Sequence, residues 1–148
     1  MTSLSRIAAA ILATSAAAFL CTAPAAAQTA PRTLYDRLGG KEALGAVVGE
    51  LWSVVAADAR INRHFARTRP EAFAGQLVDF LCQASGGPCQ YKGKDMLAAH
   101  TGMQLTDGDF TALAEDTALV LDRFKVPAQE KGEVMNMLGG LKPAVVGR

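Results

Sequence analysis

The most constraining feature of this sequence is the spacing of its apolar residues, which recur at steps of three and four residues. A helix that begins near Lys41 would carry on one face the residues Leu44, Val47, Val48, Leu51, Trp52 and Val55. No segment alternates apolar and polar residues between turn signals, as a half-buried strand does. The sequence therefore predicts an all-α fold.

A second helix is predicted between a capping sequence and a strong stop. Thr68 and Glu71 match a capping box, and the intervening Pro70 suits a first helical turn. The apolar stripe that follows consists of Phe73, Leu77, Phe80, Leu81 and Ala84. Residues 86–88, Gly-Gly-Pro, should end this helix, because glycine adopts the left-handed conformation and proline cannot continue a helix.

Three more helices are predicted in the second half of the chain. A short one runs from about Lys94 to His100, and Thr106 caps the next, which ends at residues 126–127, Val-Pro. The last helix is marked by Val134, Met137, Leu138 and Leu141. A chain of 148 residues with this pattern predicts one domain with one core.

The first 27 residues have the composition of a secretory signal peptide. Arg6 precedes an Ala-rich apolar run from Ile7 to Leu20, and residues 25–27 are the small alanines that signal peptidase requires. A membrane anchor and a lipid anchor on Cys21 are weaker alternatives. We therefore expect a signal peptide at 1–27, a domain at 28–148, export to the periplasm or the medium, and no membrane attachment after cleavage.

The net charge bears on whether the protein binds nucleic acid, and the cysteines bear on its redox compartment. Lys and Arg number 15 and Asp and Glu 14, so the chain lacks the basic surface that binds nucleic acid. In an oxidising compartment, Cys82 and Cys89 could form a disulfide that ties the end of the second helix to the following loop. The alternative is a buried Cys82 and an exposed Cys89 thiol, held apart by helix geometry.

The chain has two histidines, His64 and His100, and a metal site with several protein ligands is disfavoured. A haem needs a single axial residue, because the porphyrin supplies four nitrogen ligands. His100, at the end of the short helix, is the candidate. The apolar stripes offer as pocket walls the residues Trp52, Phe65, Phe73, Leu77, Leu81, Met96, Met103 and Phe110. Such a set equally describes an ordinary helical core.

Five motifs in order resemble the signatures of group I truncated haemoglobins. They are residues 35–40 (Tyr-Asp-Arg-Leu-Gly-Gly), 80–81 (Phe-Leu), 86–88, 91–93 (Tyr-Lys-Gly) and 96–100 (Met-Leu-Ala-Ala-His). The resemblance extends from about Thr33 to the C-terminus. It implies a two-over-two helical sandwich around haem b, with His100 as the iron's proximal ligand and Phe65 as the family's aromatic residue after the first long helix.

On the distal side the sequence departs from its relatives. Trp52 stands where the family usually has a ligand-binding tyrosine, and an indole offers one N–H donor but no hydroxyl. Leu77 replaces the family's glutamine, which leaves Gln76 as the other candidate polar group. Trp52 could equally fill the core. We expect His64 to face solvent or a haem propionate rather than to ligate the iron.

These features favour reversible binding of oxygen or another diatomic gas. The alternative is an enzyme that oxidises nitric oxide or reduces peroxide and needs an electron donor. Peroxide chemistry benefits from a distal acid–base group, and neither Trp52 nor Leu77 can serve as one. A helical scaffold without haem is a third hypothesis.

Overall fold

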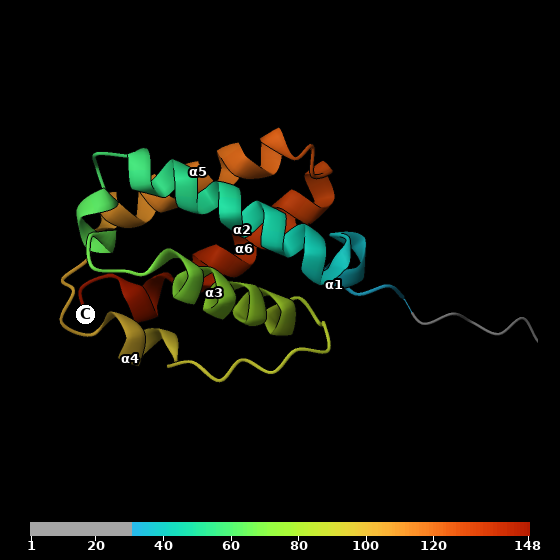
Figure 1. The fold of residues 1–148 in the computed structure, drawn as a ribbon, viewed down its shortest axis with the longest axis horizontal. Coiled ribbons are helices and arrows are strands. Elements are labelled where there is room, and N and C mark those ends of the chain that lie inside the picture. Colours follow the sequence, from blue (N-terminus) through green and yellow to red (C-terminus); the bar gives the residue numbers. More distant parts are fainter. Residues whose placement is uncertain (1–30) are drawn as a thin grey trace, which may run out of the picture. The chain divides into compact units, whose positions relative to one another are not determined.

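The computed structural model describes residues 31–148, and the regular elements in this part of the chain are helices joined by turns and loops (Figure 1). In chain order they are α1 (Leu34–Arg37), α2 (Gly40–Ala57), the 3-10 helix η1 (Asn62–Phe65), α3 (Pro70–Ala84), α4 (Met96–His100), α5 (Asp107–Arg123) and α6 (Ala128–Val145). The all-α prediction is confirmed for these residues, which contain no strand. The predicted signal peptide lies outside them. None of the described helices is long and apolar enough to cross a membrane.

Most predicted helix ends agree with the structure. Helix α2 follows Gly39, which has a φ of 93°, and α3 ends two residues before Gly86, whose φ is 85°. Thr106 caps α5 through a capping box in which its hydroxyl accepts from Asp109 N and the Asp109 carboxylate accepts from Thr106 N. The local signals at these ends act alone, so the sequence pattern is sufficient to predict them.

The predicted capping box of the second helix is wrong. Helix α3 begins at Pro70, its N-cap residue is Arg69, and no side chain caps it. Thr68 could cap only if Arg69 were already helical, but a residue before proline is pushed to extended conformations. Arg69 has the extended angles φ −81° and ψ 122°. The preference imposed by Pro70 thus overrides the capping signal of Thr68.

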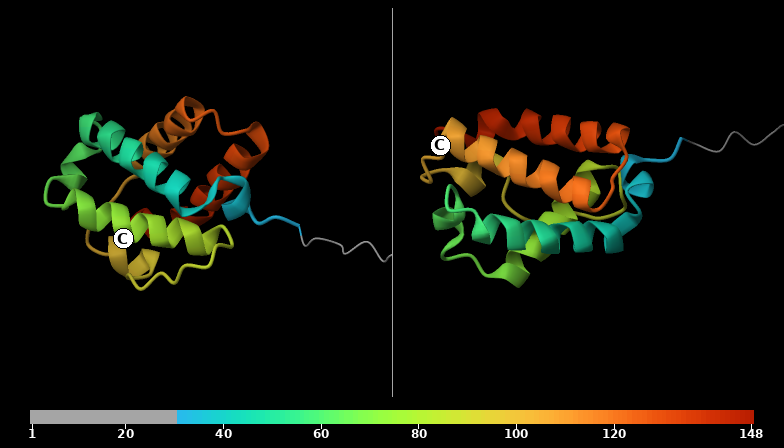
Figure 2. Two further views of the ribbon diagram at one scale, coloured as in Figure 1. Left: turned by 45° about the vertical axis from the view of Figure 1, so that its right-hand side comes forward. Right: turned by 90° about the horizontal axis from the view of Figure 1, so that it is seen from above.

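Four long helices form two layers. Helix α2 packs on both α3 and α5, and α5 packs on α6, whereas the short α4 packs on α6. The right-hand view of Figure 2 shows the pair α5 and α6 lying over the pair α2 and α3. This arrangement confirms the predicted two-over-two sandwich. Helix α4 packs on α6 of one layer, whereas α3 packs on α2 of the other.

The buried core is centred on α2. One cluster joins Leu51 and Val55 of α2 to α5 and to Ile61, and the other joins Leu44 and Val48 of α2 to α3. In α6, by contrast, only Val145 is buried. Burial of apolar surface is the main stabilising contribution to a fold. The structure therefore holds α2, α3 and α5 together without using most of the apolar surface of α6.

We predict that Thr106→Ala destabilises the protein by about 1 kcal/mol, because the first turn of α5 loses its capping hydroxyl. Chemical denaturation followed by circular dichroism would measure this change. Thr111→Ala is the matched control on the same helix, since the exposed Thr111 hydroxyl donates only to the Asp107 carbonyl and should change stability by less than about 0.5 kcal/mol. Equal effects of the two substitutions would contradict the assigned cap.

Candidate functional site

His100 is held in one orientation by its own helix. Asp95 caps α4 by accepting a hydrogen bond from Ala98 N at 2.7 Å, and His100 Nδ1 lies 2.7 Å from the Met96 carbonyl oxygen. A carbonyl can only accept, so Nδ1 carries the proton and donates it, which leaves the lone pair on Nε2. Among the described residues, none hydrogen-bonds Nε2. The ring is thus a half-buried imidazole with an available metal-binding nitrogen.

Several apolar side chains in both layers of the fold are only half-buried. In the layer of α2 and α3 they include Phe73, Leu77 and Leu81, and on α6 they are Val134, Met137, Leu138 and Leu141. Met96, one turn before His100, is also half-buried. Protein interiors normally cover such side chains fully. These apolar surfaces therefore suit a flat, mostly apolar group that would lie between the layers.

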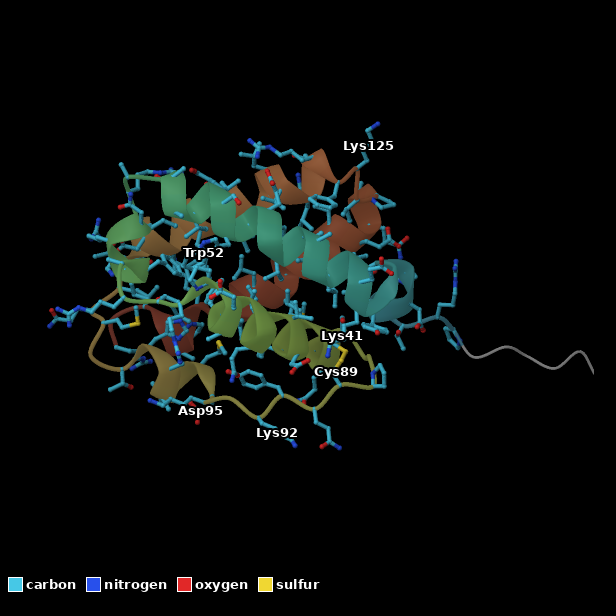
Figure 3. The ribbon with its side chains drawn as sticks, viewed as in Figure 1. Lys41, Trp52, Cys89, Lys92, Asp95 and Lys125 are labelled. Carbon is cyan, nitrogen blue, oxygen red and sulfur yellow. A yellow bond between two sulfur atoms is a disulfide. The ribbon has the colours of Figure 1, made fainter. Side chains whose placement is uncertain are left out.

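Three aromatic residues form a cluster at one end of this region. The ring centroid of Trp52 lies 5.3 Å from that of Phe73 and 6.1 Å from that of Phe65, and those of Phe65 and Phe73 lie 5.7 Å apart. The contacts of Phe65 with Trp52 and Phe73 are edge-to-face, and the contact between Trp52 and Phe73 is tilted. Ring pairs at such distances stabilise particular arrangements. Figure 3 labels Trp52 between α2 and α3. The indole N–H of Trp52 has no acceptor among the described residues, so it is available to donate.

Other predicted site residues take no part in these three ring contacts. Phe110 is buried at the start of α5, with Lys142 Nζ 5.9 Å from its ring centroid, whereas Met103 is 36% exposed after α4. Gln76 is exposed and lines a surface hollow beside Asp79 and Lys92. The structure therefore does not bring Gln76 to the aromatic cluster, and Trp52 is left as the polar donor there.

His64 contacts Asp109, a residue of α5 that is distant in the sequence. Its ring is mostly buried, and Nε2 lies 3.3 Å from Asp109 Oδ1, in contact but without the alignment of a hydrogen bond. Arg63 also contacts this oxygen, at 2.6 Å. Of the two expected surroundings of His64, solvent is wrong, because its ring lies against Asp109 at the start of α5. The contact with a haem propionate stays a prediction.

Asp109 is the centre of this connection. The hydroxyl and backbone N–H of Thr106 donate to its carboxylate, and His64 and the positive charge of Arg63 add to their effect, so the pKa of Asp109 lies well below its ordinary value. The capping signal Thr-Asp-Gly-Asp at residues 106–109 was visible in the sequence. Its link to residues 63–64, more than 40 positions earlier, was not.

Cys82 and Cys89 form a disulfide with a Cα–Cα distance of 5.7 Å. Cys82 lies near the end of α3 and is fully buried, whereas Cys89 is half-buried in the loop that leads to α4. The backbone turns sharply after Ser85, and Gly87 N donates to the Cys82 carbonyl. This turn brings the two cysteines to the separation that a disulfide requires.

Two surface hollows lie apart from His100. One, of about 410 Å³, is lined by residues of α2 and α5 that include Glu50, Asp116 and Arg123. The other, of about 520 Å³, lies beside α3 and is lined by Tyr35, Lys41, Gln76, Asp79, Pro88, Cys89, Gln90 and Lys92. Neither hollow is lined by His100.

The residues present fit the haem that the motif resemblance implies. Haem requires one axial nitrogen and an apolar slot, and His100 Nε2 and the half-buried side chains of α3, α4 and α6 provide these groups. The donation from Nδ1 to the Met96 carbonyl is the kind of second hydrogen bond that orients metal-binding histidines.

The fold and the arrangement of this region define a class of small helical haem proteins, the truncated globins. The chain belongs to the bacterial-like globin family, whose model matches residues 33–146, and within it to the group 1 truncated hemoglobins. It is 36% identical to the group 1 truncated hemoglobin of Tetrahymena thermophila over 116 residues, which cover 78% of this chain and 96% of that protein. It is also 33% identical to the group 1 truncated hemoglobin of Mycolicibacterium paratuberculosis over 115 residues, which cover 78% of this chain and 85% of that protein.

Solved structures agree with this assignment. The Fe(III) form of truncated hemoglobin from Tetrahymena pyriformis superposes with a TM-score of 0.76 at 33% identity, covering 79% of this chain and all of that one. The 2/2 hemoglobin of a Synechococcus species, in the cyanomet state and with covalently attached heme, gives 0.75 at 32% identity with the same coverage.

We predict that Asp109→Asn lowers the free energy of unfolding at neutral pH. The difference from the wild-type protein should shrink in acid. Because the folded-state pKa of Asp109 is lowered, its contribution is present above the ordinary carboxyl pKa of 3.8 and is lost as pH falls further. Denaturation midpoints of both proteins between pH 7 and 2 would test this. Asp107→Asn controls for loss of a negative charge in the same helical turn. A deficit independent of pH would exclude the ionised carboxylate as its cause.

Proposed function

We propose that this chain binds haem b with His100 Nε2 as the proximal ligand and reversibly binds oxygen or another diatomic gas. The observation that carries the proposal is the 2.7 Å contact between His100 Nδ1 and the Met96 carbonyl. Since Nδ1 is the donor in that bond, the lone pair of Nε2 is available for iron without a change of tautomer. Membership of the group 1 truncated hemoglobins supports the cofactor and the ligand class.

The remaining site residues are proposed to enclose the porphyrin. Leu77, Leu81 and Met96 would form its apolar contacts, with Phe65, Phe73, Met103 and Phe110 at its edges. When bound, haem supplies the iron on which a diatomic ligand is held. The apolar side chains would keep water away from that centre, and His100 would hold the cofactor from the opposite side.

On the distal side, we propose Trp52 as the hydrogen-bond donor to a bound ligand. Its indole N–H has no acceptor among the described residues, and its neighbours Phe65 and Phe73 cannot donate. An indole N–H does not exchange its proton as an acid or a base near neutral pH. The group therefore supports ligand binding rather than peroxide chemistry, which uses a distal acid–base residue.

We predict that His100→Gly prevents stable haem binding, because the iron loses its protein ligand. The reconstituted variant should lack the wild-type Soret band at equimolar haem, and added imidazole should restore it by occupying the space of the missing ring. His64→Ala is the control and should keep the band. A wild-type spectrum for His100→Gly without imidazole would overturn the proposed ligand.

We predict that Trp52→Phe raises the oxygen dissociation rate about two- to tenfold, since the aromatic ring is kept but one hydrogen bond, about 0.5–1.5 kcal/mol, is removed. Stopped-flow displacement of oxygen would measure the rate. Carbon monoxide dissociation is the control, because that ligand carries little charge and gains little from a donor. Equal oxygen rates in the two proteins would reduce Trp52 to a packing role.

We also propose that residues 1–27 are a signal peptide and that the domain at 28–148 works in the periplasm or outside the cell. The charged, apolar and small-residue pattern of 1–27 supports this, as does a disulfide between Cys82 and Cys89. N-terminal sequencing of the protein from a periplasmic fraction should begin at Gln28. Recovery of Met1 from the cytoplasm alone would contradict export.

A further inference from the structure

We propose that the Cys82–Cys89 disulfide is a site of thiol–disulfide exchange, entered at Cys89 by the thiolate of a dithiol reductant. We further propose that its reduction loosens the haem pocket. The second statement rests on the proposed haem function. The first does not, because it concerns the chemistry of the disulfide alone.

The two sulfur atoms differ in how a nucleophile can approach them. Cys82 is 0% exposed, and the backbone of Gly87 covers it so closely that a Cβ at Gly87 would lie 2.7 Å from Cys82 Sγ. Cys89 instead lines the 520 Å³ hollow beside α3. Exchange requires a thiolate to reach one sulfur directly, and access sets which sulfur is attacked. The geometry therefore directs attack to Cys89.

The charges around this hollow favour an incoming thiolate. Lys41 and Lys92 both line it, and Figure 3 shows their labelled side chains on the same side of the molecule as Cys89. Lys41 Nζ is paired with Asp79 at 2.9 Å, whereas Lys92 has no ion-pair partner among the described residues. The hollow thus carries a net positive charge next to Cys89. A positive surrounding attracts the thiolate, which is the reactive form of a thiol.

The exchange balances in two steps. The attacking sulfur forms a bond to Cys89 Sγ, the Cys82–Cys89 bond breaks, and Cys82 Sγ leaves with the electron pair and takes a proton from solvent. The second thiol of the reductant, once deprotonated, then attacks the mixed disulfide and releases Cys89. The dithiol is oxidised to a disulfide, and the protein gains two electrons and two protons.

This bond connects the helix of the distal pocket to the segment that leads to His100. Cys82 belongs to the α2–α3 core cluster, against which Leu77 and Leu81 also pack. Cys89 belongs to the loop between α3 and α4. The loop is also held by hydrogen bonds that do not involve sulfur, from Tyr91 N to Gln83 Oε1 and from Tyr91 Oη to the Lys94 carbonyl, each 2.8 Å. Reduction should therefore loosen this connection without unfolding the domain.

Peptide mapping tests the site of attack. The full chain is treated with glutathione as a monothiol probe, quenched in acid, alkylated with N-ethylmaleimide and digested. We expect the glutathione adduct on Cys89 and the maleimide on Cys82. The reverse pattern, or no reaction with the folded protein, would overturn the proposed entry at Cys89.

A charge variant tests the role of the hollow. Lys92→Gln should slow the reaction with glutathione about two- to fivefold at low ionic strength, and the difference should fade in high salt. Lys125→Gln removes the same charge at a position far from Cys89 in Figure 3 and should react at the wild-type rate. Equal rates for all three proteins would exclude electrostatic attraction.

Haem transfer tests the effect on the pocket. Oxidised protein, protein reduced with dithiothreitol, and the Cys82→Ala/Cys89→Ala variant are reconstituted, and haem loss to excess apomyoglobin is followed. We expect a Soret band in all three and loss at least about threefold faster from the latter two. Equal rates would overturn the coupling to the pocket. No Soret band even in the oxidised protein would instead overturn the proposed haem function, while the mapping still decides the exchange.

Discussion

The rest of this structure depends on the packing of α2 against two helices at once. Leu44 and Val48 bury against α3, and Leu51 and Val55 bury against α5 and Ile61. A single helix therefore supplies the centre of both core clusters and sets the spacing between the two layers. Helix α6 closes the second layer with only Val145 buried. The apolar surfaces that remain half-buried on α3, α4 and α6 are the consequence, and they are the surfaces that suit haem.

The proposed proximal side needs little local structure once α2, α3, α5 and α6 are packed. Helix α4 has five residues, far fewer than a helix needs to persist alone in water. It is maintained by the Asp95 cap and by packing on α6. Within it, the four-residue spacing of Met96 and His100 brings a backbone carbonyl to Nδ1 and determines which nitrogen remains available. The orientation of the candidate ligand thus follows from helix geometry, and its position follows from tertiary packing.

On the side that we propose to be distal, Gln76 and His64 do not take part in the aromatic cluster. Gln76 lines the outer hollow, and His64 lies against Asp109. In the part of the chain that the structure describes, the indole N–H of Trp52 has no acceptor, and we propose that it interacts with a small polar ligand. A pocket of this kind discriminates weakly between polar and apolar diatomic ligands, because each hydrogen bond contributes about 1 kcal/mol. The disulfide at the other end of α3 limits how far this helix can move relative to the loop that leads to α4.

The sequence by itself determined the helices, most of their ends and, through the ordered motifs, the family and its two-layer fold. Helical periodicity, the Thr106 cap and the stop at residues 86–88 depend on neighbours within a turn, so they can be recognised locally. The structure was needed to show that Arg69 rather than Thr68 is the N-cap of α3, that His64 contacts Asp109, and that Gln76 lines the outer hollow. In the first case two local preferences compete, and the steric demand of Pro70 prevails. In the others the partners come from distant segments, whose contacts depend on how the helices pack rather than on their spacing in the chain.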